Sequence, residues 1–285
     1  MPYARRMYSR PRASTRSRYL GGVVQRRRKA VRTARLKLAT PVAKLVDRRI
    51  NRKVETKVAP FHYRRTEWDN LPETQARCCQ LLRNILQGDD RSERDGSKIS
   101  LQSMLVRGYI QIPCYDQPQS NDRSNIYFRL CCLSAKAQGF YPDVLANWSG
   151  IGNYYSQLLK PAETAQAPDG QVQDMWRDIN RDAFTVHYDK VFNLSRGDAG
   201  GVVPIPAETT WRKDVIKHFR FRLKCKNKLL RYSTAVDPGT PSESIQPQNF
   251  APFIVGWWAY TNGAPASQAA VPYVEYYVNT RFKDA

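Results

Sequence analysis

Apolar and polar residues alternate with a period of two in several segments after residue 65. In residues 97–113, Ile99 and Leu101 share one phase of this alternation, and the apolar row continues one residue later from Met104. Such a phase switch indicates an extra residue in one strand of a pair. The pattern therefore predicts a long strand with a bulge near Ser103.

Three further segments alternate like half-buried strands, 125–133, 184–194 and 217–226, and two segments near the C-terminus, 251–261 and 271–282, read as aromatic strands. In segment 125–133 the pattern places Ile126, Phe128, Leu130 and Cys132 on the side that faces the core. In segment 184–194 it predicts one buried row: Phe184, Val186, Tyr188, Phe192 and Leu194. Only 73–87, 140–146 and 153–159 read as helical, and long loops are expected at 160–171 and 235–250. Strands joined by long loops, without a βαβ rhythm, predict an all-β antiparallel sandwich or jelly roll in residues 66–285.

Residues 41–65 follow a different period. Valine and isoleucine recur every four residues from Val42 to Val58 between basic side chains, after a plausible helix start at Thr40-Pro41. We therefore expect a basic amphipathic helix that ends at Pro60, followed by a linker. A stripe of β-branched residues without Trp, Phe or Met favours contact with phosphate or a protein partner over a membrane surface.

Charge is concentrated at the N-terminal end of the chain. Residues 1–65 hold twenty-one Arg and Lys against Asp47 and Glu55, a net charge of +19, whereas the whole chain carries +21. The body is therefore nearly neutral. Segregated charge of this kind is expected where one end of a chain holds a polyanion.

Residues 1–40 lack apolar periodicity, and we expect them to be a disordered nucleic-acid-binding arm. Arginine predominates in this arm, and its planar fork donates two hydrogen bonds to one phosphate. Tyr3, Tyr8 and Tyr19 either stack on bases or are simply tolerated there. Residues 26–29 also fit a nuclear import signal, formed by Arg26, Arg27, Arg28 and Lys29. The candidate nucleic-acid-binding residues of the arm and the following helix are Arg5, Arg6, Arg10, Arg12, Arg16, Arg18, Arg26, Arg27, Arg28, Lys29, Arg32, Arg35, Lys37, Arg48, Arg49, Arg52 and Lys53.

The strand at 217–226 has an unusual polar face. Phe219, Phe221, Leu223 and Cys225 share one side, and the other side carries His218, Arg220, Arg222, Lys224 and Lys226 without any acid. Like charges in a row repel one another unless an anion lies across them. This row is either an ordinary solvated face or an anion-binding surface, and the missing acids favour the second reading, with Arg220, Arg222 and Lys224 as candidate nucleic-acid contacts.

Signatures of catalysis or of a cofactor are missing from the sequence. The three histidines are isolated, no phosphate loop of the GxxxxGK[ST] type occurs, and the acidic run at 88–96 fails the spacing of a calcium loop. No GxSxG supports a catalytic triad. No window approaches eighteen apolar residues, so we expect no membrane insertion. We predict no enzyme, no metal and no cofactor.

The layout of the chain resembles the capsid proteins of circular, Rep-encoding single-stranded DNA viruses, the circovirus-like group. The resemblance lies in the Arg-rich terminus, "GDDRSERDGSKISLQSMLVRGYIQI" (88–112), "FTVHYDKVFNL" (184–194), the basic strand at 217–226 and the ending "YVEYYVNTRFKDA" (273–285). It implies one eight-stranded jelly roll and a small icosahedral shell of sixty copies, with the arms on a packaged single-stranded genome. We expect the protein in the virion and, because of the import signal at 26–29, in the host nucleus during assembly, with host import factors as partners. Residues 136–181 match no strand of this pattern and are expected to be a loop insertion.

Two other functions remain open on sequence grounds. A non-assembling nucleic-acid-binding protein with a basic tail, of ribosomal or chromatin type, would explain the arm but seldom carries a large aromatic-rich β body. An enzyme acting on nucleic acid would need the carboxylate, histidine or metal constellation that the sequence lacks.

Overall fold

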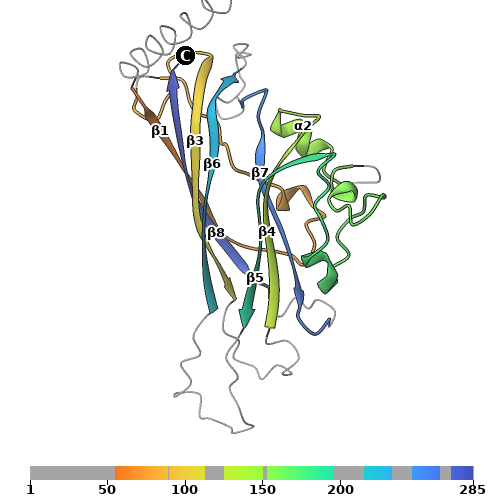
Figure 1. Ribbon diagram of the computed structural model, residues 1–285. Helices are drawn as coiled ribbons and strands as arrows, with labels where there is room; N and C mark the ends of the chain where they lie inside the picture. The colour runs from red at the N-terminus through yellow and green to blue at the C-terminus, as the bar shows by residue number, and fades with distance from the viewer. Residues whose placement is uncertain are drawn as a thin grey trace, which may run out of the picture. The chain divides into compact units, whose positions relative to one another are not determined.

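The computed structural model describes residues 55–88, 90–112, 125–149, 153–195, 215–232, 246–263 and 271–284. In these residues eight strands form two antiparallel four-stranded sheets, so the all-β class is confirmed (Figure 1). The first sheet has the order β1-β8-β3-β6, and the second has the order β2-β7-β4-β5.

Strand β1 (Lys57–Glu67) corrects the prediction for residues 41–65. The strand includes Pro60, so no helix ends there, and the β body begins before residue 66. Ala59, Phe61 and Tyr63 pack toward the core at alternate positions, which is a strand period. Proline is tolerated because β1 is an edge strand that pairs with β8 alone. The part of the predicted helix before residue 55 lies outside the described residues.

The other strands of the first sheet are β3 (Lys98–Ile112), β6 (Val215–Arg231) and β8 (Tyr273–Asp284). The predicted bulge is confirmed, because the pairing of β3 with both neighbours shifts between Leu101 and Ser103. The shift keeps Ile99, Leu101 and Met104 all buried.

The second sheet contains β2 (Cys79–Gln80), β4 (Asn125–Ala135), β5 (Phe184–Ser195) and β7 (Pro252–Tyr260). The predicted inner row of β4 is confirmed, since all four residues belong to the core between the sheets, which we call the inner core. Cys131, Leu133 and Ala135 of β4 are buried in a second core on the other side of the sheet, which we call the outer core. All nine residues of β7 are buried for the same reason.

The prediction for β5 was wrong in one respect. The pairing of β5 with β4 shifts between Val186 and Tyr188, where His187 is the additional residue. Phe184 and Val186 therefore pack in the outer core, whereas Tyr188, Phe192 and Leu194 face the space between the sheets. The sequence gives no sign of this bulge, because apolar residues alternate without interruption from Phe184 to Tyr188. Both faces of the second sheet pack against apolar side chains, so an apolar residue can be buried on either face.

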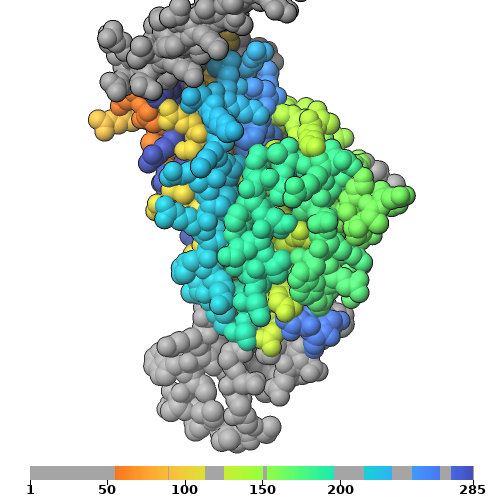
Figure 2. All heavy atoms as spheres, viewed as in Figure 1, coloured from red at the N-terminus to blue at the C-terminus, as the bar shows by residue number. Residues whose placement is uncertain are grey.

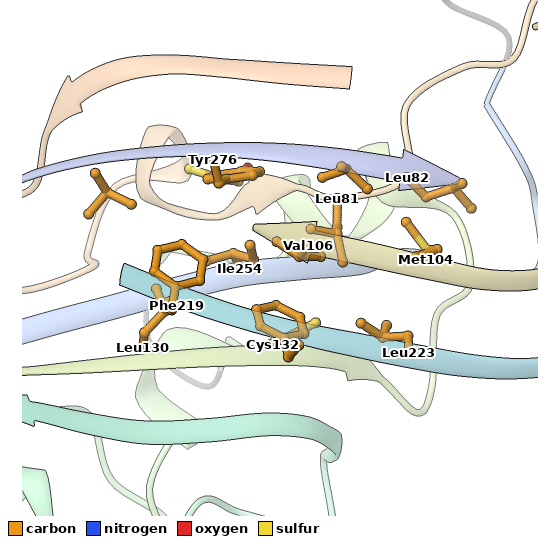
Figure 3. Close-up of a cluster of buried hydrophobic side chains, with 14 of the residues drawn as sticks. Leu81, Leu82, Met104, Val106, Leu130, Cys132, Phe219, Leu223, Ile254 and Tyr276 are labelled. Atoms are coloured by element: carbon orange, nitrogen blue, oxygen red, sulfur yellow. The ribbon is translucent and has the colours of Figure 1, made fainter. Parts of the chain in front are cut away.

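Side chains from both sheets meet in the core shown in Figure 3. Val106 and Tyr276 from the first sheet face Leu130 and Ile254 from the second. Stacked and edge-on aromatic pairs extend this core, such as Tyr188 against Phe221 with ring centroids 4.2 Å apart.

The segment between β4 and β5 covers the outer face of the second sheet (Figure 2). It contains helix α2 (Tyr141–Ala146) and two short 3₁₀ helices, η3 (Tyr155–Gln157) and η4 (Val172–Met175). Val144, Trp148 and Met175 pack from this segment onto β4 and β7. The expected loop insertion is therefore a folded layer in its described parts, residues 136–149 and 153–183, which we call the covering segment.

A buried arginine fastens the covering segment to the sheet. Arg129 of β4 forms a double hydrogen bond with Asp189 of β5, with nitrogen–oxygen distances of 2.9 and 2.6 Å. Its remaining donor reaches the carbonyl oxygens of Asp174 and Arg177 at 2.8 and 2.6 Å. Because every donor group of this guanidinium that faces the protein is satisfied, its burial is tolerated.

The predicted helix at 73–87 was also wrong. This segment has a single 3₁₀ turn, η1 (Gln75–Arg77), followed by the short strand β2. Cys78 belongs to the outer core, whereas Leu81, Leu82 and Ile85 belong to the inner core. The apolar residues of this segment are divided between two cores, because the chain crosses from one core to the other. Their spacing resembles that of one helical face, but they do not lie on a helix. Within the described ranges, no helix is both long and apolar enough to cross a membrane.

Candidate nucleic-acid interface

The outward face of the first sheet carries the basic row expected for β6. Phe219, Phe221 and Leu223 are buried, and the intervening side chains of His218, Arg220, Arg222 and Lys224 are exposed. The predicted alternation is thus confirmed, and it extends to Cys225, which packs against the core, and to Lys226, which is exposed. At Lys226 and Asn227 the backbone adopts left-handed angles (φ 49° and 60°), within a bulge at which the pairing with β3 shifts.

Pairing across the sheet adds two arginines that sequence reasoning did not single out. Arg107 of β3 lies directly opposite Arg220 of β6, and Arg281 of β8 lies opposite Ser103, which in turn pairs with Lys224. Both arginines are exposed. We use the term basic face for Arg107, Arg220, Arg222, Lys224 and Arg281. The period of two places each of them outward in its own strand, but the sequence does not reveal which strands are neighbours.

The five cations of the basic face have no carboxylate partner within ion-pair distance among the described residues. Two like charges directly opposite each other, such as Arg107 and Arg220, destabilise a sheet. An anion placed over them would remove this repulsion.

Glu275 lies in the row of this sheet face next to Arg107 and Arg220, and Glu67 lies further along it, but both acids already have partners. Glu275 lies 2.7 Å from His62 Nε2 and accepts a short hydrogen bond from the hydroxyl of Tyr109. Glu67 accepts a hydrogen bond of 2.7 Å from the hydroxyl of Tyr273. The hydrogen bond from Tyr109, aided by the one from His62, lowers the pKa of Glu275 below its ordinary value. Glu275 is therefore ionised at neutral pH, and its carboxylate is already hydrogen-bonded to His62 and Tyr109.

The spacing of the basic face suits an extended polyanion. Arg220, Arg222 and Lys224 recur every second residue, about 6.8 Å apart at roughly 3.4 Å per residue. Arg107 and Arg281 widen the row to the adjacent strands. Arginine is able to hold one phosphate with two parallel hydrogen bonds, and lysine acts as a point charge. The arrangement matches a chain of phosphates better than one compact anion.

The candidate contacts of the arm, Arg5 through Lys53 in the set given above, lie outside the described residues, as does the import signal at 26–29. Lys57, Arg64 and Arg65 belong to β1, so residues 1–56 retain eighteen bases and two acids. The cationic part of the chain leads directly into β1, which belongs to the sheet that bears the basic face.

Other kinds of site are less well supported. Among the described residues, no three side chains of the metal-ligating types His, Cys, Asp and Glu gather closely enough to hold an ion. Four of the five described cysteines are buried, and burial raises the pKa of Cys79 to about 11. A thiol with so high a pKa is protonated at neutral pH and is a poor nucleophile.

Neither a protein-family model nor a curated protein matches this chain.

Proposed function

We propose that the protein is a viral capsid protein of the circovirus-like kind, which self-assembles and packages single-stranded nucleic acid. The observation that carries this proposal is the basic face, which lacks carboxylate partners in the described part of the chain and lies on the sheet that the cationic N-terminal segment enters. Such a surface gains stability when phosphates neutralise it.

The strand pairing supports a jelly roll as the shell domain. The pairs β1·β8, β2·β7, β3·β6 and β4·β5 are all antiparallel and nested, with the first strand paired to the last. A long hairpin of four nested pairs, rolled so that alternate pairs fall into two sheets, is the jelly-roll topology used by viral capsid domains.

In this proposal the two cationic parts act together on one genome. The N-terminal segment supplies most of the net charge, and the basic face supplies further charge on a sheet that would face the interior of a shell of about sixty copies. Because the contacts are to phosphates, binding should be insensitive to sequence and strongly sensitive to salt. The packaged strand would be DNA by analogy with the circovirus-like group, and nuclear import would precede assembly.

The test of the basic face is a triple substitution, Arg220→Gln, Arg222→Gln and Lys224→Gln. Since these side chains are exposed and the buried alternate residues remain, the fold should be retained. Assembled particles, seen by electron microscopy, should contain less nucleic acid by absorbance ratio than wild-type particles.

A matched control removes three exposed cations elsewhere on the body, by Arg91→Gln, Lys136→Gln and Arg181→Gln. This control should package nearly as much nucleic acid as the wild type, because the net charge changes equally but the basic face is intact. Equal packaging by both triple variants would contradict the role of the basic face. A protein that binds nucleic acid but forms no particles would instead support the non-assembling alternative.

A further inference from the structure

An exposed tyrosine stands beside the basic face. Tyr277 of β8 lies directly opposite Arg107 of β3 on one side and His62 of β1 on the other. Arg220, Arg107, Tyr277 and His62 thus form one row across all four strands of the first sheet. Residues directly opposite in such pairs have Cβ atoms about 5 Å apart, so the row is continuous.

Tyr277 differs from the other tyrosines on this side of the sheet. The hydroxyls of Tyr109 and Tyr273 donate to Glu275 and Glu67, and both rings are partly covered. Tyr277 is 41% exposed, although its neighbours in sequence, Tyr276 and Val278, are fully buried. No hydrogen bond or ring contact holds Tyr277 in the described part of the chain.

We infer that Tyr277 is a stacking platform for an unpaired base of single-stranded nucleic acid whose phosphates lie on the basic face. The inference rests on the proposed function, because it assigns the ligand of that same surface. An aromatic ring among cations is the arrangement by which proteins bind single strands: the cations hold the backbone and the ring stacks on a base. The planar side chains of Arg107 and His62 flank the ring and extend the surface on which bases can stack.

This geometry selects against a duplex. In a double helix the base faces are covered by neighbouring base pairs, so a ring on a flat sheet has no base face to meet. Phosphate contacts alone would accept either form. Tyr277 therefore converts a general polyanion surface into one that prefers unpaired strands.

The experiment uses the full chain and a thymidine oligonucleotide of about 12 nucleotides that carries 5-iodouracil, a length within the range of known single-strand sites. After irradiation, the cross-linked peptides are mapped by mass spectrometry, which separates Tyr277 from the tyrosines of the N-terminal arm. We expect a cross-link at Tyr277 with the single strand and a much weaker one with the duplex of the same sequence.

Affinities are then compared at raised salt, where phosphate contacts weaken but stacking persists. Tyr277→Ala should weaken single-strand binding about fivefold or more, the lower end of the range for one stacked base. Tyr277→Phe, which keeps the ring, should bind like the wild type. Trp176→Ala, which removes an exposed aromatic ring on the covering segment, should also have no effect. Binding of inorganic polyphosphate should be the same in all four proteins, and near-ultraviolet circular dichroism checks their folds.

The possible failures are distinguishable. If the basic-face triple variant loses affinity but Tyr277→Ala does not, and no cross-link maps to Tyr277, the stacking role is wrong and the proposed function stands. If the triple variant also binds and packages like the wild type, the proposed function itself is wrong.

Discussion

Two pairs of arginines in the β body have opposite surroundings. Arg94 and Arg129 are buried, and their guanidinium groups are satisfied by carbonyl oxygens, by Asp189 in the case of Arg129, and by aromatic rings. Arg107 and Arg220 are exposed and face each other. The first group holds loops in place, and the second group is costly to the free protein. Side-chain type alone does not distinguish them, which is why the sequence could not identify Arg129 as structural.

At this scale the pair Arg129–Asp189 is open to test. Asp189→Asn should destabilise the protein by about 2 kcal/mol, because it leaves a buried guanidinium without its counter-charge. The measurement is the free energy of unfolding in urea. The control is Asp182→Asn, which removes a largely exposed partner of Lys160 and should cost less than about 0.5 kcal/mol. Equal effects of the two substitutions would mean that Arg129 does not fasten the covering segment.

The same pair predicts a dependence on acid. Burial opposes the charged form of Asp189, but the hydrogen bonds from Arg129 outweigh it and lower the pKa of this carboxyl below its ordinary value. A carboxyl with a depressed folded-state pKa stabilises the protein above its unfolded-state pKa, near 3.9, and this contribution is lost as the pH falls further. Unfolding curves between about pH 5 and pH 2 should therefore be less steeply pH-dependent in Asp189→Asn than in the wild type.

At the scale of elements, strand phase decides what each side chain meets. The alternation in β3, β4 and β6 could be predicted from sequence, including the bulge near Ser103, because each of these strands has a consistent apolar row. The bulges at His187 and Lys226 could not be predicted. Val186 and Tyr188 continue the apolar alternation across His187 without interruption, and the left-handed backbone angles at Lys226 do not change the hydrophobic pattern. The pairing of Arg107 with Arg220 was equally hidden, because it depends on which strands are neighbours.

Gly108 provides a test at this scale. At this position of β3 the ring of Phe219 and the backbone of β8 approach closely. A Cβ atom there would lie 2.4 Å from the carbonyl oxygen of Glu275 and 2.5 Å from the Phe219 ring. Gly108→Ala should therefore destabilise the protein by about 1–3 kcal/mol, as overpacking does. Gly96→Ala, where a Cβ meets nothing within 4 Å, is the matched control and should be nearly neutral in thermal unfolding. A neutral Gly108→Ala would show that β3 and β6 are not in the pairing described here.

At the scale of the whole molecule, folding and charge are assigned to different parts of the sequence. Among the described residues, every buried member of the two cores lies between Trp68 and Phe282, whereas most of the net charge precedes β1. Composition alone predicted this division. The predicted boundary between the two parts, at residue 65, lies too late in the sequence. Pro60 does not end a helix there but belongs to the edge strand β1, which begins at Lys57.

Deleting residues 1–40 should therefore leave the thermal unfolding midpoint of the body unchanged, because the two cores formed by the described residues remain complete. Binding to single strands should weaken, and the slope of log K against log salt should become shallower by about 0.7 for each phosphate no longer neutralised. The comparison is a salt titration of the full and shortened chains with the same oligonucleotide. An unchanged slope would mean that the first forty residues contribute nothing to phosphate contact.

Because the covering segment packs on the second sheet, the two sides of the molecule should differ in how well they tolerate inserted or deleted residues. On the first sheet, each outward side chain of β6 alternates with a core residue, so one inserted residue would exchange the cations with the phenylalanines. On the second sheet, the covering segment includes exposed residues that lie outside every strand, such as residues 161–164. Insertions there would lengthen a loop at little cost in free energy. Descendants of this sequence are thus free to remodel one side of the molecule while the spacing on the other side stays fixed.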